Sequence, residues 1–157
     1  MDRTMQQKIQ MVDLHGQYLK IKAEVDAAIA EVIDGSAFIG GPAVGRFASA
    51  LAQYTGAAHV IPCGNGTDAL QIALMALGLR SGDEVIVPAF TYVASAEVIA
   101  LLGLRPVLVD VDRSTFNIDI SCMERALTSR TRAVIPVHLF GQSCDMAPIL
   151  DFAAAHG

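Results

Sequence analysis

The sequence predicts an α/β fold, a doubly wound and mostly parallel sheet, preceded by a helical segment. After residue 56, short apolar runs alternate with stretches of helical periodicity. The runs Val85-Ile86-Val87 and Val107-Leu108-Val109 are apolar throughout rather than alternating, which is typical of parallel strands covered by helices on both faces. With 157 residues, 53% of them hydrophobic, we expect a helical segment over 1–55 and an α/β domain over 56–157.

The N-terminal segment carries two helical patterns. Apolar residues recur at helical spacing over 18–32, with charged residues between them and Gly35 as a stop signal. A second helix is predicted over 44–54, ending at Gly56, and the irregular stretch 38–42 separates the two.

The remaining chain predicts alternating strands and helices. The apolar runs that we expect to form strands are 58–62, 84–87, 106–109 and 133–137, and the helical stretches are 68–77, 92–102, 121–127 and 145–155. This order is βαβαβαβα, so the strands are parallel and joined by helical crossovers.

Charge and composition narrow the function classes. The net charge is −5 and the 11 Lys and Arg form no cluster, so we expect no nucleic-acid partner. The longest charge-free stretch, 47–67, contains several Gly and a Pro, and the first residues are polar, so we expect no membrane span and no signal peptide. Three widely spaced cysteines fit reduced thiols and a cytoplasmic protein, and no metal-ligand spacing is recognisable.

The segment 63–70 is the most informative, because small residues lead from an expected strand into a helix. Gly64 and Gly66 let a ligand approach the backbone, and the N–H groups of a helix N-terminus favour an anion. A phosphate site is the natural hypothesis. The alternative is a tight structural turn capped by Thr67 or Asp68.

Two other phosphate motifs fit this segment poorly. The spacing of Gly64, Gly66 and Ala69 satisfies the dinucleotide fingerprint, but no acidic residue follows where the next strand ends. No Lys follows the glycines, which excludes a Walker loop. At that next strand exit stand Phe90 and Tyr92. An aromatic ring there could lie flat on a planar cofactor, so the pair of features suggests pyridoxal phosphate, although either ring could be plain core.

Taken together, these segments resemble the DegT/DnrJ/StrS family of pyridoxal-phosphate-dependent sugar-nucleotide aminotransferases. The signatures that carry the resemblance are Val12-Asp13-Leu14, Phe38-Ile39-Gly40-Gly41-Pro42, Gly64-Asn65-Gly66-Thr67-Asp68-Ala69-Leu70, Gly82-Asp83-Glu84-Val85-Ile86-Val87-Pro88, Phe90-Thr91-Tyr92-Val93-Ala94 and Pro136-Val137-His138-Leu139-Phe140-Gly141-Gln142. The resemblance implies the aspartate-aminotransferase fold (fold type I), of which 56–157 would be the first half of the large cofactor-binding domain.

The resemblance also assigns roles to individual residues. Gly66 and Thr67 would bind the cofactor phosphate, Asn65 would shape the loop, and Tyr92 would stack on the cofactor ring. The stretch 38–42 would contribute to the sugar-nucleotide cleft, often at a dimer interface, so a homodimer is expected for the full-length form. The implied reaction transfers an amino group from glutamate to a keto-sugar nucleotide, for polysaccharide or secondary-metabolite biosynthesis.

No catalytic residue is assigned in this chain. In the family, the Schiff-base Lys and the Asp that pairs with the pyridine nitrogen follow later than Gly157, and the lysines here are Lys8, Lys20 and Lys22. Asp68, Asp110 and Asp112 fit turn or cap roles better, and His138 is either near the cofactor or a polar residue at a strand exit.

We therefore expect the N-terminal part of an aminotransferase that is inactive alone; the alternative is a non-catalytic product that binds a partner chain. The resemblance implies that later strands separate 58–62 from the other strands. We expect 58–62 to lack its sheet neighbours, and the isolated chain to be marginally stable.

Overall fold

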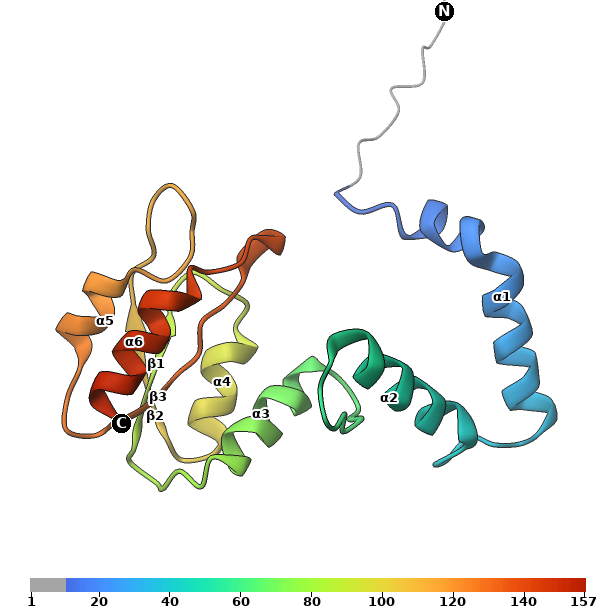
Figure 1. Ribbon diagram of the computed structural model, residues 1–157, viewed down its shortest axis with the longest axis horizontal. Coiled ribbons are helices and arrows are strands. Elements are labelled where there is room, and N and C mark those ends of the chain that lie inside the picture. The colour runs from blue at the N-terminus through green and yellow to red at the C-terminus, as the bar shows by residue number, and fades with distance from the viewer. Residues whose placement is uncertain (1–10) are drawn as a thin grey trace, which may run out of the picture. The chain divides into compact units, whose positions relative to one another are not determined.

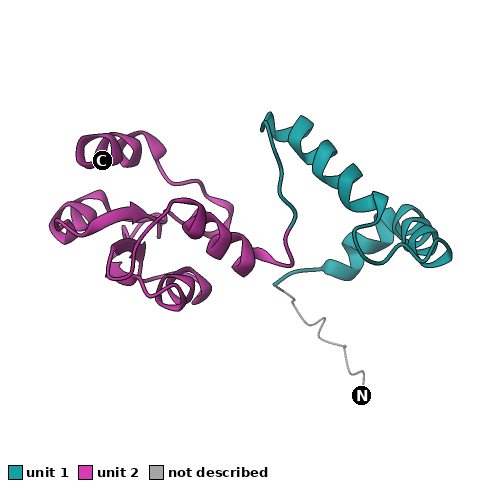
Figure 2. Ribbon diagram, turned by 90° about the horizontal axis from the view of Figure 1, so that it is seen from below, with its two compact units in different colours: residues 1–62 teal, residues 63–157 magenta. Residues whose placement is uncertain are grey.

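The computed structural model describes residues 11–157, which divide into two compact units, 11–62 and 63–157 (Figure 2). The elements in chain order are α1 (Leu14–Asp34), α2 (Pro42–Thr55), α3 (Gly66–Ala76), β1 (Glu84–Pro88), α4 (Ala94–Leu101), β2 (Arg105–Val109), α5 (Ile120–Ala126), β3 (Thr131–Val134), the short 3₁₀ turn η1 (Leu139–Gly141) and α6 (Met146–His156).

The first unit contains the two predicted helices, α1 and α2. Asp13 caps α1 by accepting a hydrogen bond from the N–H of Gly16 at 2.8 Å, and Gly35 follows the last turn. Helix α2 starts on Pro42 and ends at Gly56, whose φ of 74° is the left-handed conformation that glycine adopts without strain. Neither helix contains a buried residue, so their apolar faces are at most half-buried among residues 11–62.

The second unit is the predicted parallel α/β sheet. β1 lies between β2 and β3 and pairs in parallel with both. Figure 1 shows these strands between α4 on one side and α5 on the other. Val85 and Val87 pack with Leu74 of α3 and Val98 of α4, whereas Ile86 packs on the other side. This alternation along one buried strand is why β1 reads as a continuous apolar run.

Helices α5 and α6 cover the second face. Met123 of α5 and Phe152 of α6 pack with Ile86 and Val109 in one buried cluster. The sheet is therefore covered on both faces, as the sequence predicts.

Residues 58–62 do not form the strand expected from their apolar run, but they lack sheet neighbours, as expected. These residues are irregular, and the sheet has three strands, none of which pairs with them. A strand needs neighbours for its backbone N–H and C=O groups, and an apolar run does not supply them. The loop into α3 is therefore approached by irregular chain rather than by a strand.

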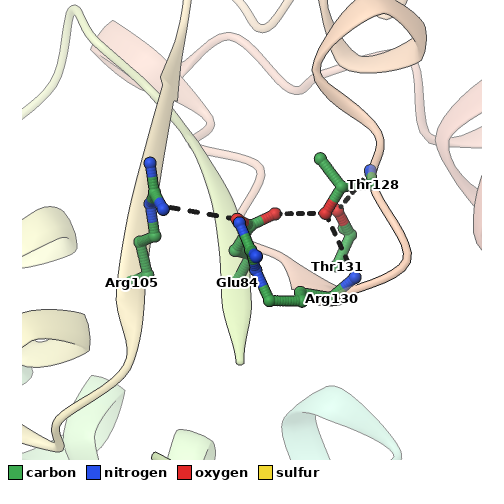
Figure 3. Close-up of polar contacts among 5 residues, drawn as sticks. All are labelled: Glu84, Arg105, Thr128, Arg130 and Thr131. Carbon is green, nitrogen blue, oxygen red and sulfur yellow. Dashed lines mark hydrogen bonds and ion pairs between the residues drawn. The ribbon is translucent and has the colours of Figure 1, made fainter. Parts of the chain in front are cut away.

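The amino ends of the strands are tied together by one buried carboxylate (Figure 3). Glu84 is 2% exposed, and Arg130 donates to its Oε1 from Nη2 at 2.7 Å and from Nε at 3.1 Å. The hydroxyl of Thr128 donates to Oε2, and the Arg105 guanidinium lies 3.8 Å from Oε1. The hydrogen bonds from Thr128 and Arg130 lower the pKa of Glu84 below its usual value.

None of the helices described in residues 11–157 is both long enough and apolar enough to cross a lipid bilayer.

Candidate functional site

The phosphate-type loop forms the first turn of α3. Asn65 is the N-cap residue, and its Oδ1 accepts a hydrogen bond from the N–H of Asp68 at 2.9 Å. The N-cap residue is therefore Asn65. The sequence had suggested Thr67 or Asp68 as the cap, if the segment were a structural turn rather than a phosphate site. Gly66 and Thr67 are the first two residues of the helix.

The N–H groups of Gly66 and Thr67 donate no hydrogen bond within residues 11–157, and neither does the Thr67 hydroxyl. A Cβ added to Gly66 would meet no atom within 4 Å, so the approach to these amides is open. Two free amides, a hydroxyl and the positive end of a helix form a donor set suited to a phosphate group.

Tyr92 lies between β1 and α4, and its side chain is 76% exposed. The carbonyl of Tyr92 accepts from the N–H of Ser95 at 3.1 Å, which starts the turn into α4. Helix α4 packs against α3, and α3 ends just before the chain enters β1. Both views show the first turn of α3 at the end of this helix farther from the sheet (Figures 1 and 2), and no hydrogen bond within residues 11–157 joins it to Tyr92.

At the edge of the sheet where β1 ends, the sequence predicted the aromatic residues Phe90 and Tyr92, but not that Phe90 gathers with two further rings. The ring of Phe90 lies 5.4 Å from that of Phe116 and 6.4 Å from that of Phe140, measured between centroids. Phe116 and Phe140 have φ values of 59° and 55°, a left-handed conformation that costs a non-glycine residue about 1–2 kcal/mol. Each of the three rings comes from a different loop, so only the folded sheet brings them together.

Two further polar candidates, His138 and Asp112, have structural partners. His138 accepts from the N–H of Cys144 at its Nδ1 atom, at 3.0 Å, and so braces the loop between β3 and α6. Asp112 accepts from the backbone N–H groups of Ser114 and Thr115, each at 2.9 Å, and from the Ser114 hydroxyl; these bonds lower the pKa of Asp112. Both residues are occupied within their own turns.

None of the three lysines of the sequence belongs to residues 63–157, the unit that contains the sheet. Lys20 and Lys22 lie on α1, and Lys8 lies outside the described residues. Lys22 donates to Asp26, and this hydrogen bond raises the pKa of Lys22. A lysine that attacks a carbonyl needs its neutral form, which a raised pKa disfavours.

Sequence relatives cover almost the whole chain. It is 49% identical over 149 residues to the UDP-2-acetamido-2-deoxy-3-oxo-D-glucuronate aminotransferase of Pseudomonas aeruginosa, a match that spans 95% of this chain and 42% of that protein. It is 40% identical to the dTDP-3-amino-3,4,6-trideoxy-alpha-D-glucose transaminase of Streptomyces venezuelae, over 96% of this chain and 40% of that protein. The chain thus spans about two fifths of the length of these curated relatives.

Solved structures agree with these relatives. Streptomyces venezuelae DesV, in complex with a ketimine intermediate, matches 96% of this chain with a TM-score of 0.91 and 40% identity, over 40% of its own length. A DegT/DnrJ/EryC1/StrS aminotransferase from Brucella abortus matches 96% of this chain with a TM-score of 0.90 and 41% identity, over 42% of its own length. Residues 19–157 match the family model as well, and the chain belongs to the DegT/DnrJ/EryC1/StrS aminotransferase family.

Proposed function

We propose that this chain is the N-terminal part of a pyridoxal-phosphate-dependent aminotransferase that transfers an amino group from glutamate to a keto-sugar nucleotide. The observation that carries the proposal is the open first turn of α3, with two unused amides and an unused hydroxyl, in a chain of this family. Relatives named as aminotransferases of UDP- and dTDP-linked sugars support the substrate class.

The proposed cofactor site consists of Asn65, Gly66, Thr67 and Tyr92. The amides of Gly66 and Thr67 and the Thr67 hydroxyl would bind the phosphate, and Asn65 would hold the loop in shape. The exposed ring of Tyr92 would cover one face of the pyridine ring and exclude water from it. Bound pyridoxal phosphate supplies an electron sink for amino transfer. A relative solved with bound pyridoxamine phosphate, 36% identical over 87% of this chain, supports this choice.

Residues 38–42 belong to the proposed sugar-nucleotide cleft, and a homodimer is the proposed assembly. The exposure of Phe38 and Ile39 supports a role in contacting another molecule. A cytoplasmic location is supported by the free thiols of Cys63, Cys122 and Cys144.

The test is a titration of the ¹⁵N-labelled chain with pyridoxal 5′-phosphate, followed by NMR. We expect the amide resonances of Gly66 and Thr67 to shift, and Thr67→Val to weaken binding about tenfold, because a hydrogen bond to a charged group is lost. Tyr92→Ala is expected to weaken binding too, whereas Tyr54→Ala, which removes an exposed ring from α2, serves as the matched control. Unchanged Gly66 and Thr67 resonances at saturation would refute the site.

A second test concerns catalysis by the 157 residues. We expect no amination of a keto-sugar nucleotide with glutamate, and no specific labelling after borohydride reduction with pyridoxal phosphate, because no lysine here follows the phosphate loop. Stoichiometric labelling of one lysine, located by mass spectrometry, would show that this chain carries the Schiff-base residue.

A further inference from the structure

We propose that Asp68 is a positioning residue for the phosphate group of the cofactor, acting through Asn65. The inference rests on the proposed function, and it concerns a carboxylate that an anion site would not be expected to contain. The presence of a ligand in this fold is supported independently by the matching structures solved with bound cofactor or intermediate.

Asn65 and Asp68 hold each other through two hydrogen bonds. Asn65 Oδ1 accepts from the N–H of Asp68 at 2.9 Å, and Asn65 Nδ2 donates to Asp68 Oδ2 at 3.1 Å. The two residues occupy the N-cap and third positions of α3, as in a capping box, but the return bond goes to the side-chain amide of the cap. The carboxylate therefore fixes the rotation of the Asn65 carboxamide.

This arrangement determines which N–H groups in the first turn of α3 are already hydrogen-bonded and which remain free for a ligand. The third N–H, that of Asp68, is consumed by Asn65, and the fourth, that of Ala69, donates to the Asn65 carbonyl at 3.1 Å. The N–H groups of Gly66 and Thr67 remain for a ligand. With the Asn65 carboxamide free to rotate, its oxygen could turn toward these amides and compete with the phosphate.

Gly64 lies next to the Asp68 carboxylate, where only a residue without a side chain leaves room for the bond to Asn65. A Cβ at Gly64 would lie 2.7 Å from Asp68 Oδ2. A side chain at position 64 would thus push the carboxylate away from Asn65 Nδ2, so the glycine and the carboxylate are fitted to each other.

Whether a substitution of Asp68 weakens or strengthens phosphate binding distinguishes a positioning role from a purely electrostatic effect. A carboxylate close to a phosphate repels it, so charge alone predicts that any neutral residue at position 68 strengthens phosphate binding. Positioning predicts that only a residue able to accept the bond from Asn65 Nδ2 preserves binding. Asp68→Asn keeps an acceptor oxygen and loses the charge, and Asp68→Ala loses both.

The experiment titrates inorganic phosphate into the full 157-residue chain and follows the amides of Gly66 and Thr67 by NMR. We expect Asp68→Ala to bind about fivefold more weakly than the native chain, as the loss of one hydrogen bond implies. Asp68→Asn is expected to bind at least as tightly as the native chain. Asp145→Ala, which removes the N-cap side chain of α6, is the matched control and should leave phosphate binding unchanged.

A separate readout follows Asn65 itself. Its side-chain NH₂ resonances should move in Asp68→Ala without any ligand, while circular dichroism reports whether the variant folds. If Asp68→Ala does not fold, Gly64→Ala replaces it, because it displaces the carboxylate without removing it, and it should also weaken phosphate binding.

Two failures are distinguishable. If phosphate shifts neither Gly66 nor Thr67 in the native chain, the proposed site is wrong, and this role of Asp68 with it. If the native chain responds and both Asp68 variants bind more tightly than it does, the site stands and the positioning role is overturned.

Discussion

Both units contain helices with apolar residues at helical spacing, but only the helices of the second unit bury some of these residues. Helices α1 and α2 have the apolar spacing of amphipathic helices, yet neither buries a residue, and Ile29 remains 54% exposed. In the second unit, every residue of β1 is buried and the covering helices each bury at least one side chain.

This difference in burial between the two units shows what an amphipathic pattern specifies and what it does not. The pattern determines which face of an element can be buried, but the free energy is gained only when another element covers that face. The second unit contains its own partners on both faces of the sheet. The apolar faces of α1 and α2 are at most half-buried among residues 11–62.

The largest expected effect on the free energy of unfolding comes from replacing one isoleucine in each unit by alanine. Ile86→Ala removes a fully buried side chain from the middle of β1 and is expected to reduce the free energy of unfolding by about 2–5 kcal/mol. Ile29→Ala in α1 is the matched control, with an expected change within about 0.5 kcal/mol. Urea unfolding measures both, and equal effects would show that α1 is buried in solution.

The second prediction concerns the buried carboxylate at the start of β1. Glu84→Gln is expected to lower the melting temperature, because Arg130 loses its ionic acceptor, whereas Glu124→Gln on the exposed surface of α5 should leave it unchanged. The pKa of Glu84 is lowered in the folded chain, so its contribution to stability is complete above the ordinary glutamate value.

That contribution is lost as the pH falls through the lowered pKa and the carboxylate takes up its proton. The difference in melting temperature between native chain and variant should therefore be constant near neutral pH and shrink below about pH 4.5. A difference that grows on acidification would contradict the assignment of Glu84 as the ionised partner.

The smallest expected effects concern the stability of α2 and two of its glycines, Gly45 and Gly56. Gly45 lies inside α2 with open space at its Cβ position, so Gly45→Ala should stabilise the helix by about 0.5–1 kcal/mol. Gly56 ends the same helix at φ 74°, so Gly56→Ala should cost about 1 kcal/mol. Backbone chemical shifts over residues 42–55 report both, and changes of the same sign would show that the helix does not end at Gly56.

Several features followed from the sequence because they depend on neighbouring residues alone. The presence of α1 and α2 and their ends near Gly35 and at Gly56 followed from apolar spacing and the glycines, although α1 begins at Leu14 and α2 at Pro42, earlier than the sequence predicted. The parallel sheet came from runs that are apolar on both faces, and the family came from short motifs in a fixed order. The roles of Asn65, Gly66, Thr67 and Tyr92 in holding a cofactor remain predictions.

Other features were decided by the tertiary structure. Whether 58–62 becomes a strand depends on a neighbouring strand to pair with, and an apolar run contains no information about that neighbour. The gathering of Phe90, Phe116 and Phe140, like the burial of Glu84 against Arg130, joins residues more than 20 positions apart. By itself, the sequence therefore determined where the helices and the strands β1, β2 and β3 lie along the chain and which family the chain belongs to, since these depend on local spacing and short motifs. Pairing and burial were left to the tertiary structure, because each requires a second segment that local spacing does not identify.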